Sequence, residues 1–437
     1  MKKHLLESII TPIIASLIAV LSFTACNGSL SGSLSRGNVC VNVILPDGLD
    51  EESVTEQSCA FRNISSGTTS RFIATDNIEL LPGLYDLDYE AKATLPNGAI
   101  TTLRASVRSV QVTASVNISF TPFSCVETDD LIITEIFFTG TTHPSGTNYN
   151  GDDYIKLYNN SDHVIYADGI ALIESKFNTT QKYDYTPDIM DWCVTVDAIY
   201  VIPGNGHDHP VNPGEYLLIA DTGIDHRALN PYSFDMSDAD FEWYDVSTSP
   251  GNLDIDSPTV PNLDKWYCYT LSFFMLHNRG FKAYGLARIP VDKETYLKEY
   301  IYDYDYTIVS DAGSFPMTGT AYMIPNEWIV DMVNCSIKAS YAWTVCHPAL
   351  DMGWSSCGTI DRDKNRFFHS VRRKLLYVND EGLPVFKDTN NSSADFNPDC
   401  VASEIELQGT VTDLSGNRCT TVTYDGVTPL PQSNRIR

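Results

Sequence analysis

The loop from Gly206 to Pro210 brings together residue types that bind transition metals. His207 and His209 flank Asp208 in this loop. Imidazole nitrogens and carboxylate oxygens are ligands suited to zinc, nickel or copper. Adjacent residues of an extended chain point to opposite sides, however, and a proline-glycine turn follows, where polar residues are expected in any case. The loop is therefore a candidate metal site, and an ordinary exposed loop is the alternative interpretation.

An acidic segment supplies a second candidate metal site. Asp235, Asp238 and Asp240 lie close together in the sequence, and calcium prefers such oxygen-rich loops. The segment lacks the turn glycine and the distal bidentate glutamate of calcium-binding loops. Calcium is a candidate cofactor and none is required, because an acidic, solvated surface explains the same residues.

One segment approaches the nucleophile elbow of hydrolases. The sequence Gly-Trp-Ser-Ser-Cys-Gly at residues 353–358 differs from Gly-x-Ser-x-Gly by Cys357, which stands in place of the second glycine. Asp361 and His369 follow closely, but a loop would have to assemble them into a triad. A hydrolase with its site in residues 175–365 is therefore an alternative function, and a disulfide is the simpler role for Cys357.

Aromatic residues suggest a binding surface. The chain has 24 Tyr, 18 Phe and 6 Trp, and Trp243, Tyr244, Trp266 and Tyr267 fall in or beside a long predicted loop. Aromatic rings in loops can stack on a glycan. Strands and cores also favour aromatic residues, so packing is the alternative for each of these four side chains.

The cysteines fit an oxidising compartment. Of the 11 cysteines, one lies in the N-terminal leader and the rest form an even set. Bridges from Cys40 to Cys59 and from Cys400 to Cys419 are the simplest pairs, since each closes a short loop. The sequence contains no Cys-x-x-Cys pair, which argues against a thioredoxin-like site and a zinc knuckle.

The charge of the chain limits its partners. The sequence has 56 acidic and 29 basic residues, for a formal net charge of −27. This balance repels a phosphate backbone and argues against nucleic acid or an anionic lipid surface as a partner. Cations and cationic partners remain compatible with it.

The first 26 residues resemble a bacterial lipoprotein signal. Lys2 and Lys3 precede an apolar run, and small residues precede Cys26. The resemblance implies that residues 1–26 direct export, that Cys26 carries the lipid, and that the protein is anchored to an outer membrane on its periplasmic or its outer side. An uncleaved single-span anchor is the alternative. Residues 27–37 are rich in Gly and Ser and predict a flexible tether.

Residues 38–123 predict a β-sandwich. Val39, Val41 and Val43 alternate on a first strand, and further short alternating segments follow. The turn and strand Leu-Pro-Gly-Leu-Tyr at residues 81–85 resembles an element of carboxypeptidase-regulatory-like and prealbumin-like modules. Such modules are spacers or adhesive units.

Residues 130–400 resemble the lamin-tail domain, an immunoglobulin-like β-sandwich. The resemblance is carried by residues 131–137 and 153–160, with Lys156 where that family usually has glutamate, and continues at the strands predicted for residues 164–172 and 211–220. Long loops would separate these strands. The whole layout resembles an uncharacterised family of Bacteroidetes lipoproteins, which implies location and architecture and no activity.

Three further segments complete the expected fold. Helical patterns are scarce; residues 292–299 could make two turns, and the alternating tyrosines of residues 302–306 predict a strand. Residues 401–437 predict terminal strands or a stub. We therefore expect an all-β protein of tandem β-sandwiches.

The expected function is binding rather than catalysis. The partner would be another envelope protein, a glycan or a peptide, and an accessory role beside an outer-membrane transporter is one version. A structural adhesin or spacer is a further alternative, which predicts an extended tandem shape without a pocket.

Overall fold

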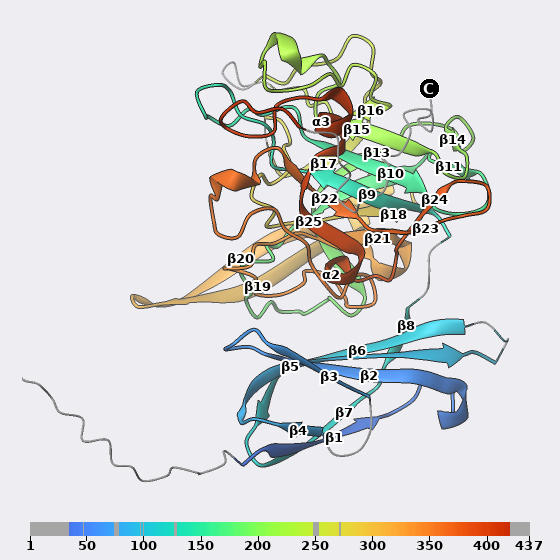
Figure 1. The fold of residues 1–437 in the computed structure, drawn as a ribbon, viewed down its shortest axis with the longest axis vertical. Helices are drawn as coiled ribbons and strands as arrows, with labels where there is room; N and C mark the ends of the chain where they lie inside the picture. Colours follow the sequence, from blue (N-terminus) through green and yellow to red (C-terminus); the bar gives the residue numbers. More distant parts are fainter. Residues whose placement is uncertain are drawn as a thin grey trace, which may run out of the picture.

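The computed structural model describes residues 35–419, except residues 47, 74–77, 97, 99, 126–128, 248–252 and 271. The lipidation expected at Cys26, most of the predicted tether and the strand predicted at residues 420–424 lie outside these described residues. Figure 1 shows two β-rich units that follow one another in the chain. Within the described part of the chain, no helix has the length and apolar character needed to cross a bilayer.

The N-terminal sandwich, residues 37–125, consists of two sheets. The smaller sheet has the order β4 (Ile78–Leu80), β1 (Gly37–Val43), β7 (Ser115–Phe120), with β1 parallel to β7. The larger sheet has the order β3 (Thr69–Ile73), β2 (Val54–Asn63), β5 (Gly83–Thr94), β6 (Ile100–Val112), β8 (Phe123–Cys125). The larger sheet faces the second unit in Figure 1, and the smaller sheet lies on the far side.

Alternation along the strands gives the larger sheet of the N-terminal sandwich one apolar and one polar face. Phe61 on β2 and Leu87 on β5 are buried in the core between the two sheets. Arg62, Asp86 and Asp88 are their chain neighbours and point to the opposite face, because successive residues of a strand alternate. A polar sheet surface therefore faces the second unit.

The C-terminal sandwich, residues 131–411, also has two main sheets. One has the order β16 (Phe241–Glu242), β15 (Tyr216–Ala220), β10 (Tyr154–Asn159), β9 (Leu131–Phe137), β22 (His369–Arg373), β25 (Phe396–Val401). The other has the order β19 (Ile301–Ser310), β20 (Gly313–Pro325), β13 (Cys193–Val201), β12 (Ile170–Ser175), β18 (Ala283–Arg288), β21 (Ile329–Asn334), and β17 (Asp264–Cys268) pairs with β13. Two short antiparallel pairs are added, β11 (Ile165–Tyr166) with β14 (Pro210–Val211) and β23 (Leu375–Val378) with β24 (Pro384–Phe386).

The main strands of the C-terminal sandwich are covered on both faces. Ile155 and Leu157 of β10 lie in the core between the sheets, together with Leu172 of β12. Tyr154 lies on the other face of β10, in a second apolar cluster with Ile405. Every residue of β10 is therefore buried, and the loops and short helices that cover the outer faces become part of the fold. These sheets confirm the expected all-β, sandwich-type architecture.

The segment after β25 is helical, where the sequence predicted a strand. Helix α3 (Ser403–Gln408) ends at Gly409, whose φ of 61° closes the helix in the left-handed region. Glu404 lies 2.8 Å from the ammonium of Lys156 on β10, and Lys156 is also within 3.8 Å of Glu135 on β9. This buried ion pair fixes the helix on the sheet, a long-range effect that local alternation does not reveal. It also gives Lys156 a packing role.

Two local predictions agree with the structure. Helix α1 (Lys293–Glu299) starts after Asp292, whose carboxylate accepts from the backbone N–H of Thr295. In the following strand, β19, Tyr302 and Tyr304 are buried and Asp303 between them is exposed. The other short helix, α2 (Ser392–Asp395), has no counterpart among the predictions.

The structure contains neither predicted disulfide. All ten cysteines among the described residues are free thiols. Cys59 lies in the core of the N-terminal sandwich, whereas Cys40 is exposed on β1 of the smaller sheet, so the Cys40 side chain points away from the core that contains Cys59. Cys400 is buried on β25 and Cys419 is partly exposed near the end of the described chain. Short separation in sequence therefore did not bring either pair into bonding distance.

Candidate functional site

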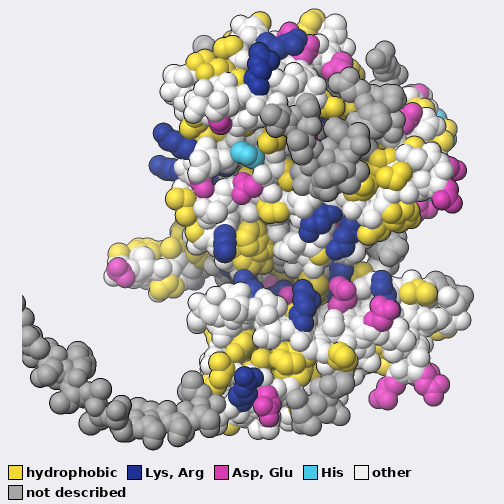
Figure 2. Space-filling model, in the orientation of Figure 1, with side chains coloured by type: hydrophobic (Ala, Val, Ile, Leu, Met, Phe, Trp, Pro, Cys, Tyr) yellow, Lys and Arg dark blue, Asp and Glu magenta, His cyan; other side chains and the backbone are white. Residues whose placement is uncertain are grey.

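A cleft separates the outer face of the N-terminal sandwich from loops of the C-terminal sandwich. Its volume is about 980 Å³, in the upper part of the range of about 300–1,000 Å³ that is typical of ligand pockets. Figure 2 shows Lys and Arg side chains gathered near the boundary between the two units. We call the strands on the N-terminal side the floor and the loops on the other side the roof.

The floor consists of paired charges on adjacent strands. Arg62 on β2 lies directly opposite Asp86 on β5, and their side chains form an ion pair of 2.8 Å. Arg108 on β6 pairs with Asp88 at 2.6 Å, and Ser106 donates to the same carboxylate. These pairs are partly exposed, so each contributes little to stability and its guanidinium can turn to another anion.

The roof contains a stacked pair of aromatic rings. The ring centroids of Tyr341 and Trp354 are 4.8 Å apart, and the ring planes differ by 18°. Ser393 holds the backbone of Trp354 through two hydrogen bonds. Its hydroxyl donates to the Trp354 carbonyl and accepts from the backbone N–H of Trp354, each at 2.9 Å. Trp343 also lines the cleft, and its indole N–H donates to the carbonyls of residues 178 and 181.

The buried carboxylate of Asp351 holds the roof loops together. It accepts hydrogen bonds from the backbone N–H groups of Asn334, Gly353 and Ser392, from the Asn334 amide and from the Ser392 hydroxyl. Burial raises its pKa, and these hydrogen bonds oppose that effect. Asp351 thereby joins the end of β21, the loop that carries Trp354 and the start of α2.

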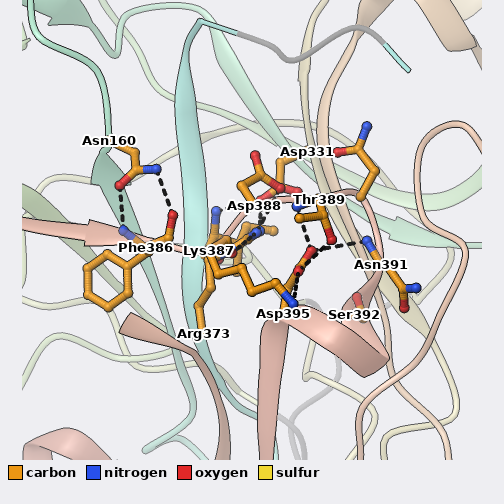
Figure 3. A network of polar contacts seen from close by, with 12 residues as sticks. Asn160, Asp331, Arg373, Phe386, Lys387, Asp388, Thr389, Asn391, Ser392 and Asp395 are labelled. Carbon is orange, nitrogen blue, oxygen red and sulfur yellow. Dashed lines mark hydrogen bonds and ion pairs between the residues drawn. The ribbon is translucent and has the colours of Figure 1, made fainter. Parts of the chain in front are cut away.

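A second polar network supports the same loops from behind. Figure 3 shows Asp395 directed toward Thr389 and Asn391, and its carboxylate accepts from both backbone N–H groups. In the same network the buried Arg373 of β22 donates to Asp331 of β21 at 2.6 Å. Because β21 and β22 belong to different sheets, this pair ties the two sheets together beneath the roof.

Three contacts connect the two units beside the cleft. The Arg62 guanidinium lies 5.5 Å from the centre of the Tyr341 ring, within the range of a cation–π interaction. Arg104 of β6 donates to the carbonyl of Asn390 at 3.0 Å, and the rings of Phe123 and His347 meet edge to face with centroids 4.6 Å apart. These contacts hold the floor and the roof at a fixed separation.

The cleft has an excess of positive charge. Arg62, Arg108, Lys182 and Lys338 line it, and Asp86 is the single carboxylate among the described residues that do so. No carboxylate among the described residues forms an ion pair with Lys182 or Lys338. Burial raises the pKa of Tyr341 to about 12, against the lowering effect of the nearby Arg108 and Arg62. Tyr341 therefore stays neutral and can donate a hydrogen bond.

The aromatic residues singled out from the sequence lie elsewhere. Trp243 is fully buried in the core between the sheets, so it cannot stack on a ligand. Trp266 and Tyr267 on β17 are partly buried and pack against Tyr296 and Tyr322. Tyr244 is partly buried. Trp243, Trp266 and Tyr267 follow the packing alternative, because Trp243 lies in the core between the sheets and the other two residues belong to strand β17.

The predicted metal ligands are dispersed. His207 packs edge to face on Tyr166, and His209 packs on Phe241. Asp235 pairs with Arg227 and accepts from Ser237, while Asp240 accepts from the N–H of Leu218 and Asp238 is exposed. Among the described residues, no group of three or more His, Cys, Asp or Glu side chains is arranged to hold a metal ion.

The elbow-like segment lines the cleft without forming a triad. Ser355 is buried at the cleft, and its hydroxyl has no hydrogen-bond partner among the described residues. Cys357 is a buried thiol, and His369 directs its Nδ1 toward the carbonyl of Phe367. Asp361 pairs with Arg279. The segment thus contributes Trp354 and a hydroxyl to the cleft instead of a nucleophile with its base.

Sequence reasoning did not identify the residues that form this cleft. Arg62 and Arg108 lie in strands where charged residues are ordinary, and Tyr341 lies in a segment without a recognisable motif. The motif at residues 353–358 was the nearest signal, because it contains Trp354. Only the docking of the two units brings these residues together.

Residues 212–403 match the family model described as "Protein of unknown function (DUF4876)". The DUF4876 match begins before β15 and ends at the start of α3, so it includes the roof residues from Lys338 to Ser393 and excludes Lys182 and the floor. A comparison with curated proteins gives no match.

Solved structures give one informative fold likeness. The chain is similar to a DUF4876 family protein from Bacteroides thetaiotaomicron, with 18% identity and a TM-score of 0.52 over 84% of this chain and 96% of that one. At this identity the likeness concerns the fold alone. A structure from Bacteroides ovatus that is described as a proposed adhesin matches at 8% identity with a TM-score of 0.17, over 67% of this chain and 82% of that one, and supports no argument.

Proposed function

We propose that this chain is a non-catalytic binding protein of the bacterial cell envelope and that the cleft between the two sandwiches holds its ligand. The stacked pair of Tyr341 and Trp354 carries the proposal, because the Trp354 ring that lines the cleft is held in place by the Tyr341 ring, by Ser393 and by the buried Asp351. Rigid aromatic area at the mouth of a polar cleft is a common basis for ligand recognition.

The location of the protein is part of the same proposal. The leader ending at Cys26 supports lipid anchoring at an outer membrane, on either its periplasmic or its outer side. The tether of residues 27–37 would let the sandwiches stand away from the lipid surface. A glycan, a peptide or another envelope protein, including a transporter to which this chain is an accessory, remains the proposed class of partner.

The proposed relationships of the two domains to known families go beyond the fold likeness. We retain the lamin-tail-like description of residues 130–400 and the regulatory-like description of residues 38–123 as proposals, based on the motifs of those segments. The hydrolase alternative is less favoured, because the Ser355 hydroxyl at the cleft has no base beside it among the described residues. The spacer alternative predicts no pocket, and the cleft weighs against it.

The experiment is to probe immobilised glycan and peptide libraries with the mature protein and two variants. We expect Trp354→Ala to lose at least about tenfold in affinity for any ligand that the wild type binds, because truncation of a central aromatic contact has effects of this size. Trp192→Ala is the matched control, since Trp192 is 53% exposed and lies outside the cleft. Equal binding by wild type and Trp354→Ala, with both folded by circular dichroism, contradicts the proposal.

A further inference from the structure

We infer that the ligand of the cleft is a saccharide that carries carboxylate or sulfate groups, an inference that rests on the proposed function. Positive charge is the first reason. A chain with a formal charge of −27 places two arginines and two lysines around one cleft, with a single carboxylate among the described lining residues. The local field at the cleft therefore favours an anion even though the whole molecule repels one.

The lysines are the second reason. Lys182 lies with its ammonium 5.5 Å from the centre of the Trp343 ring, and Lys338 is exposed on the roof. The floor arginines already hold Asp86 and Asp88, whereas no described carboxylate forms an ion pair with either lysine. The uncompensated charge is therefore on the roof side, next to the aromatic platform.

The aromatic platform favours a saccharide over other anions. Tyr341 and Trp354 stack with nearly parallel planes, and the Arg62 guanidinium lies over the Tyr341 ring. The apolar surface that the pair offers to a ligand is therefore the ring face of Trp354 that points away from Tyr341. A pyranose ring has a flat apolar face of C–H groups that packs on such a surface, while its hydroxyls need polar partners. The buried hydroxyl of Ser355 lacks a partner among the described residues, and Ser356 and Ser393 also line the cleft.

The platform and the charges together define the binding mode. A sugar ring would lie on the outer face of Trp354, its anionic substituent would face Lys182 or Lys338, and a neighbouring residue of the oligosaccharide would reach the floor arginines. The cleft volume of about 980 Å³ accommodates an oligosaccharide of a few rings. An acidic peptide meets the charge requirement but makes no particular use of the flat outer face of Trp354.

The test compares pairs of oligosaccharides that differ only in charge. The probes are a panel of uronic-acid and sulfated oligosaccharides, each with its carboxyl-reduced or desulfated counterpart, and hexaglutamate as the acidic peptide. We expect at least one acidic saccharide to bind at least about tenfold tighter than its neutral counterpart, and its affinity to fall between about 50 and about 250 mM salt.

Two double variants locate the charge. Lys182→Gln with Lys338→Gln should weaken the acidic saccharide about tenfold and leave the neutral counterpart unchanged, because only the ion contacts are removed. Lys182→Arg with Lys338→Arg should retain binding. Lys298→Gln with Lys364→Gln is the matched control, since both lysines are exposed outside the cleft.

Each other outcome overturns the inference. Equal or tighter binding of every neutral counterpart, with loss in Trp354→Ala, leaves the proposed function standing and removes the anionic specificity. Binding of hexaglutamate that depends on the two lysines, without binding of any acidic saccharide, replaces the saccharide by an acidic peptide. Absence of binding to all probes and to the broader glycan and peptide libraries rejects the inference together with the proposed function.

Discussion

Two regions of the molecule distribute charge in opposite ways. At the cleft, cations outnumber carboxylates and remain accessible. The acidic cluster, which we define as Asp153, Asp221, Glu242 and Asp254, lies beside the ends of β10, β15 and β16, in the part of the unit remote from the N-terminal sandwich in Figure 1. Its carboxylates are largely buried and close enough to raise one another's pKa.

The comparison shows why a net charge does not identify a ligand. Burial and neighbouring carboxylates raise the pKa of Asp221 and Asp153, raise that of Glu242 to about 7 and raise that of Asp254 to about 6. Part of the formal charge of −27 is thus suppressed inside the fold. The exposed field depends on where unpaired groups remain accessible, and at the cleft these groups are cations.

The largest expected effect is a loss of stability when the loops of the roof lose the carboxylate of Asp351. Asp351→Asn keeps the side-chain volume but replaces one accepting oxygen by a donor that faces the donors of Asn334 and Ser392. We expect the free energy of unfolding to fall by about 3 kcal/mol, since buried donors without acceptors cost about 1–3 kcal/mol each. Chemical denaturation measures this change. Asp311→Asn, at an exposed turn, is the control, and a loss equal to that of the control would show that Asp351 does not organise the roof.

The acidic cluster should make stability depend on pH in a defined direction. Carboxylates with raised pKa bind more protons in the folded than in the unfolded state between about pH 4.5 and 7.5. Their contribution to stability is therefore full below the unfolded pKa and is lost as the pH rises through the folded pKa. We expect the free energy of unfolding to decrease across this range.

A variant within the cluster sharpens this prediction. Asp221→Asn removes a buried charge, and one oxygen of Asp221 has no hydrogen-bond partner among the described residues. We expect it to stabilise the protein by about 1–2 kcal/mol at pH 7.5 and to have a smaller effect at pH 4.5. Denaturation of both proteins at the two pH values measures this difference. A destabilisation that is the same at both values would show that the charge of Asp221 does not destabilise the folded protein.

The smallest effect concerns the docking of the two units. Arg104→Met preserves the buried aliphatic stem but removes the hydrogen bond to Asn390 and the ion pair with Glu90. We expect a loss of about 1 kcal/mol and a larger radius of gyration by small-angle X-ray scattering, because the N-terminal sandwich is held less firmly. Arg36→Met, on the far side of that sandwich, should leave scattering unchanged. An unchanged radius in both variants would show that the other contacts are sufficient.

The sequence predicted the elements that depend on neighbouring residues and missed those that depend on residues far away in the chain. The alternating tyrosines of β19 and the Asp292 cap of α1 are local signals, and both predictions agree with the structure. Helix α3 depends on the buried pair of Glu404 and Lys156, which are far apart in the chain. The wrong prediction of a strand there follows from the alternation of Glu and apolar residues.

The candidate site was missed for a related reason. Trp243 and Trp354 are the same residue type in irregular segments, yet one is fully buried in the core and the other lines the cleft. Their environments depend on which loop folds over the sheet and on how the N-terminal sandwich docks. Neither fact has a local signature in the sequence.

Hydrogen–deuterium exchange of the mature protein, with and without a bound acidic oligosaccharide, tests the location of the site most directly. The proposal predicts slower exchange in the roof segments 338–344 and 353–357 and in the floor segment 105–110, with no change around the acidic cluster. Slowed exchange confined to segments outside the cleft would contradict the central claim that the cleft between the two sandwiches is the ligand site.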